Sequence, residues 1–290
     1  MPLTHLLLIL AIVFVWGTNF VVIKWGLAEL PPFLLASLRF LFSALPFVCF
    51  VKRPAVPWRH LVAVGVLLGV GQFGLLFQAM RADISPGMAS LVVQTQVFFT
   101  IVLAVLWRGE RPRLLQGAAL ALAVAGMALI GANLDSSVSL LGLALVLGAA
   151  LCWAGSNLVV RAAGRVDALA FMVWASVFAA PPLALLSLVF EGPAAIGHAL
   201  SQASVSAWGV VLWQAWGNTL FGYGAWNWLL ARHPAATVTP GALLVPVFGM
   251  SASALVFHEA LPGWKLGAAA LVIAGLALNV LASRPAVRAR

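Results

Sequence analysis

Charged side chains are scarce in this sequence. Asp, Glu, Lys and Arg together make up 8% of the 290 residues, whereas 63% are hydrophobic. A soluble domain carries roughly 25% charged residues, because its surface faces water. So few charges exclude a soluble globular domain and indicate that lipid surrounds most of the chain.

Cysteine and catalytic motifs are also lacking. The two cysteines, Cys49 and Cys152, each lie inside an apolar run, which argues against a disulfide or a paired metal site. The five histidines lie at or near the ends of apolar segments, and no paired acids, Gly-x-Ser-x-Gly or His-Glu-x-x-His motif is present. We therefore expect no enzyme activity, no metal and no cofactor. Nothing resembles the selectivity filter or the ring of like charges of a channel.

Long apolar segments, by contrast, fill the chain. A helix needs about 20 mostly apolar residues to cross a bilayer, and ten segments meet this requirement. We interpret residues 191–206, between two of them, as an outer loop. The sequence thus predicts an all-α integral membrane protein with ten transmembrane helices. The expected spans are residues 6–27, 32–51, 61–80, 85–107, 114–132, 140–160, 169–190, 207–230, 236–257 and 264–282.

The basic residues are distributed unevenly between the two sides of these spans. Of the 16 Lys and Arg residues, twelve fall on the side of the two termini, three fall on the opposite side, and Arg39 lies within the second span. Basic residues gather in the cytoplasmic loops of membrane proteins, so we expect both termini in the cytoplasm. This bias explains the net charge of +9 with the lipid bilayer as partner and without nucleic acid. The twelve are Lys52, Arg53, Arg59, Arg108, Arg111, Arg113, Arg161, Arg165, Arg232, Arg284, Arg288 and Arg290, and the three are Lys24, Arg81 and Lys265.

The two halves of the chain resemble each other. Sixteen residues separate Glu110 from Gly126 in the first half, and the same number separates Glu259 from Gly275 in the second (126 − 110 and 275 − 259). Each glutamate precedes a proline and a new helix, where we expect its carboxylate to cap the positive helix end. Trp16-Gly17-Thr18-Asn19 in the first span likewise matches residues 153–157 (Trp-Ala-Gly-Ser-Asn) in the sixth.

These matches predict two repeats, residues 1–135 and 136–290, with five spans each. Because five is odd, the second repeat enters the membrane from the opposite side. Inverted repeats of this kind are typical of secondary transporters, whose binding sites lie at the interface between the repeats. A chance likeness between apolar segments is the alternative explanation.

Three motifs resemble the EamA-type drug/metabolite transporter superfamily. They are Trp-Gly-x-Asn-Phe at residues 16–20, Leu38-Arg39-Phe40, and Gly-Glu-Arg at residues 109–111. The likeness covers essentially the whole chain, and residues 16–24, 94–100 and 243–247 are most similar to O-acetylserine/cysteine exporters of bacteria. The resemblance implies an inner-membrane exporter, monomeric or homodimeric, that carries amino acids or cysteine-pathway metabolites by alternating access. Another metabolite or a drug-like compound remains the alternative substrate.

Polar residues within the spans are the candidates for substrate binding, because they are costly in lipid and usually face a partner or a wet cavity. Trp16 and Asn19 share one face of the first span, and Asn157 occupies the matching place in the sixth. Gln72 and Gln94 lie within the third and fourth spans. Hydrogen bonding between helices is the alternative role for these amides.

Three further candidates carry rings or charge. Trp216 and Tyr223 lie on an aromatic stripe of the eighth span, which indicates either a cavity wall or packing. Arg39 is the one basic residue well inside a span, and it must pair with a carbonyl, another polar group or a substrate carboxylate. Three prolines begin or interrupt the fourth and ninth spans and are candidate hinges: Pro86, Pro240 and Pro246.

Overall fold

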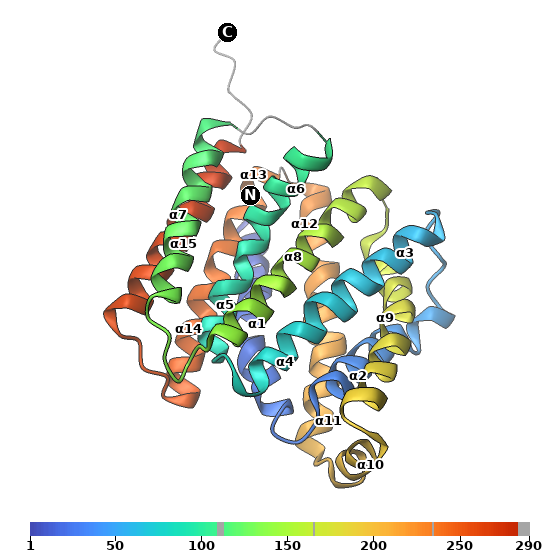
Figure 1. Cartoon of the computed structure of the whole chain (residues 1–290). Helices are drawn as coiled ribbons and strands as arrows, with labels where there is room; N and C mark the ends of the chain where they lie inside the picture. Colours follow the sequence, from blue (N-terminus) through green and yellow to red (C-terminus); the bar gives the residue numbers. More distant parts are fainter. Residues whose placement is uncertain (109–112, 165, 234, 284–290) are drawn as a thin grey trace.

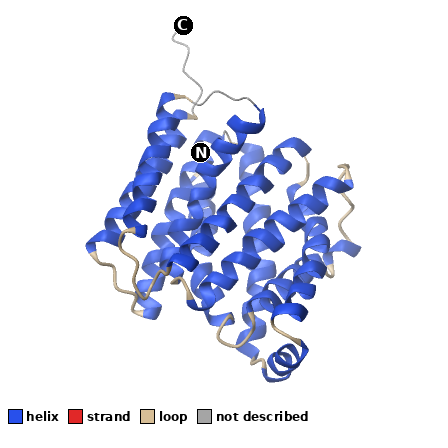
Figure 2. Cartoon of the chain, viewed as in Figure 1, coloured by secondary structure: helices blue, strands red, loops and turns tan. Residues whose placement is uncertain are grey.

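The computed structural model describes residues 1–108, 113–164, 166–233 and 235–283, and every regular element in these ranges is a helix (Figure 2). The first half contains α1 (Leu3–Gly26), α2 (Pro32–Ala44), η1 (Phe47–Cys49), α3 (Trp58–Val64), η2 (Gly65–Gly74), α4 (Leu75–Ala82), α5 (Pro86–Val92), η3 (Val93–Thr95), α6 (Gln96–Arg108) and α7 (Leu114–Gly131). The second half contains α8 (Leu140–Ala163), α9 (Ala168–Phe190), α10 (Pro193–Gln202), α11 (Val205–Leu212), η4 (Trp213–Phe221), α12 (Gly222–Arg232), α13 (Ala235–Val238), η5 (Thr239–Leu243), α14 (Leu244–Phe257) and α15 (Gly263–Ala282).

Nine segments of the described chain are long and apolar enough to cross a bilayer. Each begins and ends within a few residues of a span expected from the sequence. The remaining expected span is the continuous helical run α11–η4–α12, which extends from one end of the bundle to the other (Figure 1). The ten-helix prediction therefore agrees with the structure.

One expectation about the connections is wrong. Residues 191–206 do not form a simple outer loop, because they contain the short helix α10. Gly192 has a positive φ of 83°, which suits glycine, and Pro193 occupies the first helical turn. These two residues turn the chain out of α9 and start a new helix at the end of the bundle (Figure 1).

Each helix contact between the spans has a matching contact in which the two halves of the chain have changed places. The second span packs on the seventh (α2 on α9), and the fifth packs on the tenth (α7 on α15). The first span packs on the ninth (α1 on α14), just as the sixth packs on the fourth (α8 on α6). This exchange symmetry is the arrangement expected for two inverted five-helix repeats.

Two matching glycines show the same symmetry in atomic detail. A Cβ atom on Gly126 of α7 would lie 2.8 Å from a methyl group of Val272 on α15. A Cβ atom on Gly275 of α15 would lie 2.7 Å from the carbonyl oxygen of Ala119 on α7. Small residues let membrane helices approach closely, so the equal spacing noted in the sequence reflects one reciprocal contact.

Glutamates of the second half cap helices of the first half. Glu191 accepts hydrogen bonds from the backbone N–H groups of Phe33 (2.6 Å) and Leu34 (3.1 Å) in the first turn of α2. Glu259 accepts from Gly87 N (3.3 Å) in the first turn of α5. The sequence predicts that Glu259 caps the helix that follows it. That helix, α15, has no side-chain cap, so this prediction is wrong. The other predicted cap, Glu110, lies outside the described residues.

The two ends of the bundle differ in the number of their basic residues. Helix α1 begins and α15 ends at the same end of the bundle (Figure 1). Basic residues of the described chain at helix ends or connections on that side are Lys52, Arg53, Arg59, Arg113, Arg161 and Arg232. At the opposite end, Lys24 Nζ donates to the last carbonyls of α4, Met80 O and Arg81 O, at 2.8 and 3.0 Å. A cation there stabilises the negative end of the helix.

Candidate functional site

Arg39 lies at the centre of a buried polar cluster. Its side chain is 0% exposed and extends from α2 toward η4. It donates hydrogen bonds from Nη1 to Gln214 Oε1 (2.9 Å), and from Nη2 and Nε to Thr219 Oγ1 (2.9 and 3.2 Å). On its other side, the ring centroid of Phe73 in η2 lies 3.7 Å from the guanidinium carbon. Three spans from both repeats thus meet at one cation.

The π-helical geometry of η4 brings Gln214 and Thr219 to the same partner. An α-helix turns about 100° per residue, so residues five apart would point roughly 140° away from each other. In a π-helix, residues i and i+5 are linked by the backbone hydrogen bond and share a face. Thr219 Oγ1 also donates to the backbone carbonyl of Gln214 (2.8 Å). Short π-helical segments are frequent at functional sites.

The first span completes the cluster. Asn19 and Gln214 exchange two amide hydrogen bonds, from Gln214 Nε2 to Asn19 Oδ1 (2.7 Å) and from Asn19 Nδ2 to Gln214 Oε1 (3.3 Å). One turn earlier on α1, Trp16 Nε1 donates to the backbone carbonyl of Asn218 (3.3 Å). The residues predicted on this face of the first span therefore do lie beside Arg39's partners.

The charge of Arg39 has no opposite charge next to it. Within the described residues, its hydrogen-bond partners are an amide and a hydroxyl, and no carboxylate is paired with it. A guanidinium has five N–H groups, and three of them are engaged in these bonds. A buried cation is costly unless it is paired and hydrogen-bonded, so the cluster is suited to receive an anion.

Two nearby spans carry buried oxygen atoms without partners. Within the described residues, Gln72 Oε1 on η2 and Asn218 Oδ1 on η4 are buried and accept no hydrogen bond. Gln72 adjoins Phe73, and Asn218 adjoins Thr219, the two residues that contact the guanidinium. Buried polar atoms are nearly always hydrogen-bonded, so these two oxygens are unusual among the described residues.

Aromatic rings from the first and eighth spans lie next to this cluster. The ring of Trp16 is 5.6 Å from Tyr223 and 5.2 Å from Trp226, centroid to centroid. Trp216 is placed differently: it is 43% exposed, and its Nε1 donates to Phe42 O (3.1 Å) at the end of α2. The structure therefore groups Trp16 with Tyr223 and leaves Trp216 partly exposed, in a separate contact with the end of α2.

The other two predicted amides lie in separate contacts. Asn157 on α8 donates to Gln96 Oε1 (2.8 Å) and Thr100 Oγ1 (3.4 Å) of α6, which is the helix-to-helix role considered as its alternative. Gln94 Nε2 donates to the carbonyl of Ala242 (3.4 Å). This second bond joins η3 to η5, the 3₁₀ segments that interrupt the fourth and ninth spans.

The candidate hinge prolines surround these interruptions. Pro86 is the first residue of α5, following the N-cap Ser85, whose side chain accepts from Met88 N. Pro240 lies within η5, and Pro246 lies in the first turn of α14. Because 3₁₀ stretches within a long helix often mark hinges, the geometry is compatible with the predicted role.

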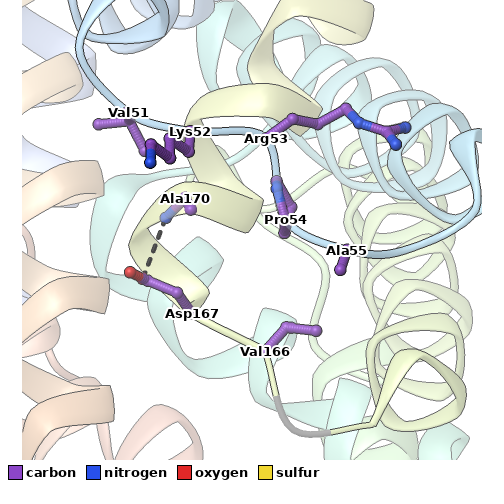
Figure 3. A pocket seen from close by; sticks show the side chains of 8 residues that line it. All are labelled: Val51, Lys52, Arg53, Pro54, Ala55, Val166, Asp167 and Ala170. Atoms are coloured by element: carbon purple, nitrogen blue, oxygen red, sulfur yellow. Dashed lines mark hydrogen bonds between the residues drawn. The ribbon is translucent and has the colours of Figure 1, made fainter.

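A separate hollow of about 410 Å³ opens at the end of the bundle that carries most basic residues (Figure 3). It lies between the connection that contains Lys52 and Arg53 and the start of α9. Asp167 there accepts from the backbone N–H groups of Leu169 and Ala170 and caps the helix. All of its lining residues come from helix ends or the connection (Figure 3), so this hollow is distinct from the cluster around Arg39.

Comparison with known proteins identifies the fold. The sequence pattern of the EamA-like transporter family matches residues 3–132 and again residues 140–281. The chain belongs to the EamA-like transporter family. This confirms the resemblance inferred from the three motifs and the prediction of a membrane transporter rather than an enzyme.

Curated relatives extend over nearly the same length. A protein of Salmonella typhimurium (strain LT2), named "Probable amino-acid metabolite efflux pump", is 40% identical over 96% of this chain and 95% of its own length. A protein of the same name from Escherichia coli (strain K12) is 38% identical over the same shares. A solved crystal structure superposes on this EamA-like transporter with a TM-score of 0.65 at 20% identity, covering 97% of this chain and 98% of that chain. It shares the fold.

Proposed function

We propose that this EamA-like transporter exports amino-acid metabolites across the inner membrane of a bacterium by alternating access. Two relatives that match over nearly their full length are named "Probable amino-acid metabolite efflux pump". The observation that carries the proposal is the buried cation Arg39, held between spans of both repeats by neutral groups alone among the described residues. A site for a small polar solute at the interface between inverted repeats is typical of secondary transporters.

The residues proposed to contact substrate lie on the spans that form the cluster around Arg39. They are Trp16, Asn19, Gln72 and Tyr223 in addition to Arg39 itself. Gln94 and Asn157 are proposed to line the path between the repeats when the helices separate, with Pro86, Pro240 and Pro246 as hinges. The proposed boundary between the repeats lies at residues 135 and 136, within the connection between α7 and α8.

Transport in proteoliposomes that contain only this protein tests the proposal. We expect efflux of labelled small amino acids and cysteine-pathway metabolites, and a lower rate in folded Asn19→Ala and Gln94→Ala variants. Thermal unfolding should stay close to wild type in Gln94→Ala and fall in Asn19→Ala, which leaves Gln214 Nε2 without its partner. Trp216→Phe is the matched control, because Trp216 is partly exposed and lies in a separate contact with the end of α2. Normal transport by both alanine variants would disprove this site. Transport of drug-like compounds alone would favour the alternative substrate class.

A further inference from the structure

We propose that the carboxamide of Gln214 occupies the place of the substrate's amino-acid head group. This inference rests on the proposed function and names the chemistry of its site. Gln214 presents an acceptor, Oε1, to Arg39 Nη1 (2.9 Å) and a donor, Nε2, to Asn19 Oδ1 (2.7 Å). An α-amino acid carries the same two functions side by side, a carboxylate acceptor and an ammonium donor.

Replacement of the Gln214 side chain by the substrate is favourable at each contact. The carboxylate would replace a neutral amide oxygen on a guanidinium that, within the described residues, has no charged partner. The bond from Arg39 to Gln214 already has a charged donor, and a carboxylate would add a charged acceptor, which gives the strong guanidinium–carboxylate pair. The ammonium would replace an amide N–H on Asn19 Oδ1.

The same contacts explain how the empty transporter remains stable. With no substrate, Gln214 supplies hydrogen bonds to both Arg39 and Asn19, so neither group is buried without a partner. Thr219 keeps two bonds to Arg39 and holds the guanidinium in position while Gln214 is displaced. Arg39 is therefore the carboxylate-binding residue, Asn19 binds the amino group, and Gln214 competes with the substrate for both.

This assignment predicts which solutes are carried. Substrates need a free carboxylate next to a free amino group, whatever their side chain. The methyl ester of an amino acid loses the negative charge that Arg39 would bind, and the amine formed by its decarboxylation loses the whole acceptor group. Both should therefore inhibit transport of the labelled amino acid at least about tenfold more weakly than the amino acid itself, the factor that one charged hydrogen bond contributes.

Two substitutions at one position provide the test. Gln214→Glu places a permanent carboxylate on Arg39, so we expect thermal unfolding at or above the wild-type temperature and a loss of amino-acid transport of about ten- to a hundredfold. Gln214→Met keeps the size of the side chain and removes the competitor. It should lower the KM for amino acids, with some loss of thermal stability.

The outcomes separate this inference from the proposed function. Wild-type rates in a folded Gln214→Glu variant, or equal inhibition by the methyl ester and the free acid, would overturn the inference while amino-acid export stands. If the wild-type protein moves no amino acid in the panel, the proposed function fails and this inference fails with it. Parallel losses of stability and transport in both variants would show that Gln214 is structural, and would also overturn the inference.

Discussion

At the residue scale, the protein stabilises two buried cations in opposite ways. Arg39 is held by an amide, a hydroxyl and an aromatic ring. Lys265, expected on the outer side of the membrane, is only 2% exposed and forms an ion pair with Glu259 (3.1 Å), whose side chain is 7% exposed. Glu259 also accepts from Ser85 and Ser253 (both 2.6 Å). The charge of Arg39 thus remains available to a ligand, whereas the charge of Lys265 is neutralised by Glu259.

Loss of one partner of the ion pair should therefore cost more than loss of both. Lys265→Met leaves a buried carboxylate without its cation, which typically costs about 3–5 kcal/mol of stability. The double variant Lys265→Met/Glu259→Gln removes both charges and should recover much of that loss. Thermal or chemical unfolding of the purified protein measures both changes. Equal destabilisation of the single and double variants would contradict the prediction.

The sequence indicates part of the polar cluster around Arg39. Arg39, Asn19 and Trp16 could be predicted because a polar or charged side chain within an apolar span is costly and conspicuous. Gln214 and Thr219 were missed, although both are also polar residues of the eighth span. The period of an α-helix places the aromatic stripe on one face of the eighth span, whereas the π-helical geometry of η4 directs Gln214 and Thr219 together into the core. Hydropathy does not distinguish the two helix types.

At the scale of elements, the interruptions of the spans match between the two repeats. The third and eighth spans each contain a π-helical segment, η2 and η4. The fourth and ninth spans each contain a 3₁₀ segment, η3 and η5. The span boundaries could be predicted because apolar runs end at charged or proline-rich connections. The interruptions could not, since they depend on packing between spans that are far apart in the sequence.

A histidine pair joins the beginning of α1 to the end of α12. His5 Nδ1 lies 2.6 Å from His233 Nε2, and the His5 ring is 5.0 Å from that of Trp228. Partial desolvation lowers the pKa of His233 below its ordinary value of 6.5, and His5, the N-terminal amine and Arg232 act in the same direction. The folded state therefore favours the neutral imidazole.

This pKa sets the direction of a pH effect on stability. Because the unfolded chain protonates first as the pH falls below about 6.5, the contribution of the pair is complete above that pH and is lost as the pH falls through the lowered pKa. Thermal unfolding between about pH 8 and pH 5 should show this loss, and His233→Gln should reduce it. His198→Gln, on the exposed face of α10, is the control. An unchanged pH profile in His233→Gln would refute the assignment.

At the scale of the whole molecule, the charge difference between the two ends predicts orientation. Positively charged loops stay in the cytoplasm, so a reporter fused after the last residue should be active only on the cytoplasmic side. Reporters fused in the connection between α4 and α5 should be active only on the opposite side. Activity of the C-terminal fusion in the periplasm would contradict the ten-span topology.

The positions of the acids predict the mode of energy coupling. Proton-driven carriers commonly relay protons through an acid or a histidine within the membrane. The six acids in the described residues lie at helix ends or in connections: Glu29, Asp83, Asp135, Asp167, Glu191 and Glu259. Glu110 lies outside the described residues. We therefore expect facilitated diffusion or exchange, driven by the gradient of the substrate itself.

Proteoliposomes with an imposed pH gradient measure this directly. The initial rate of efflux should be the same with and without the gradient, and an ionophore should not change it. Uphill accumulation of substrate driven by protons would contradict the prediction. It would direct attention to Glu259, whose ion pair with Lys265 would then be the first candidate for a proton-exchanging pair.

The capping of the first half by the second has a consequence for how the chain is made. A ribosome delivers α2 and α5 to the membrane long before it reaches Glu191 and Glu259, the residues that later bind their first amide groups. During that interval, the early helices have incomplete ends and lack the spans on which they pack. The first turns of α2 and α5 therefore gain these side-chain caps only after the seventh and ninth spans have been made.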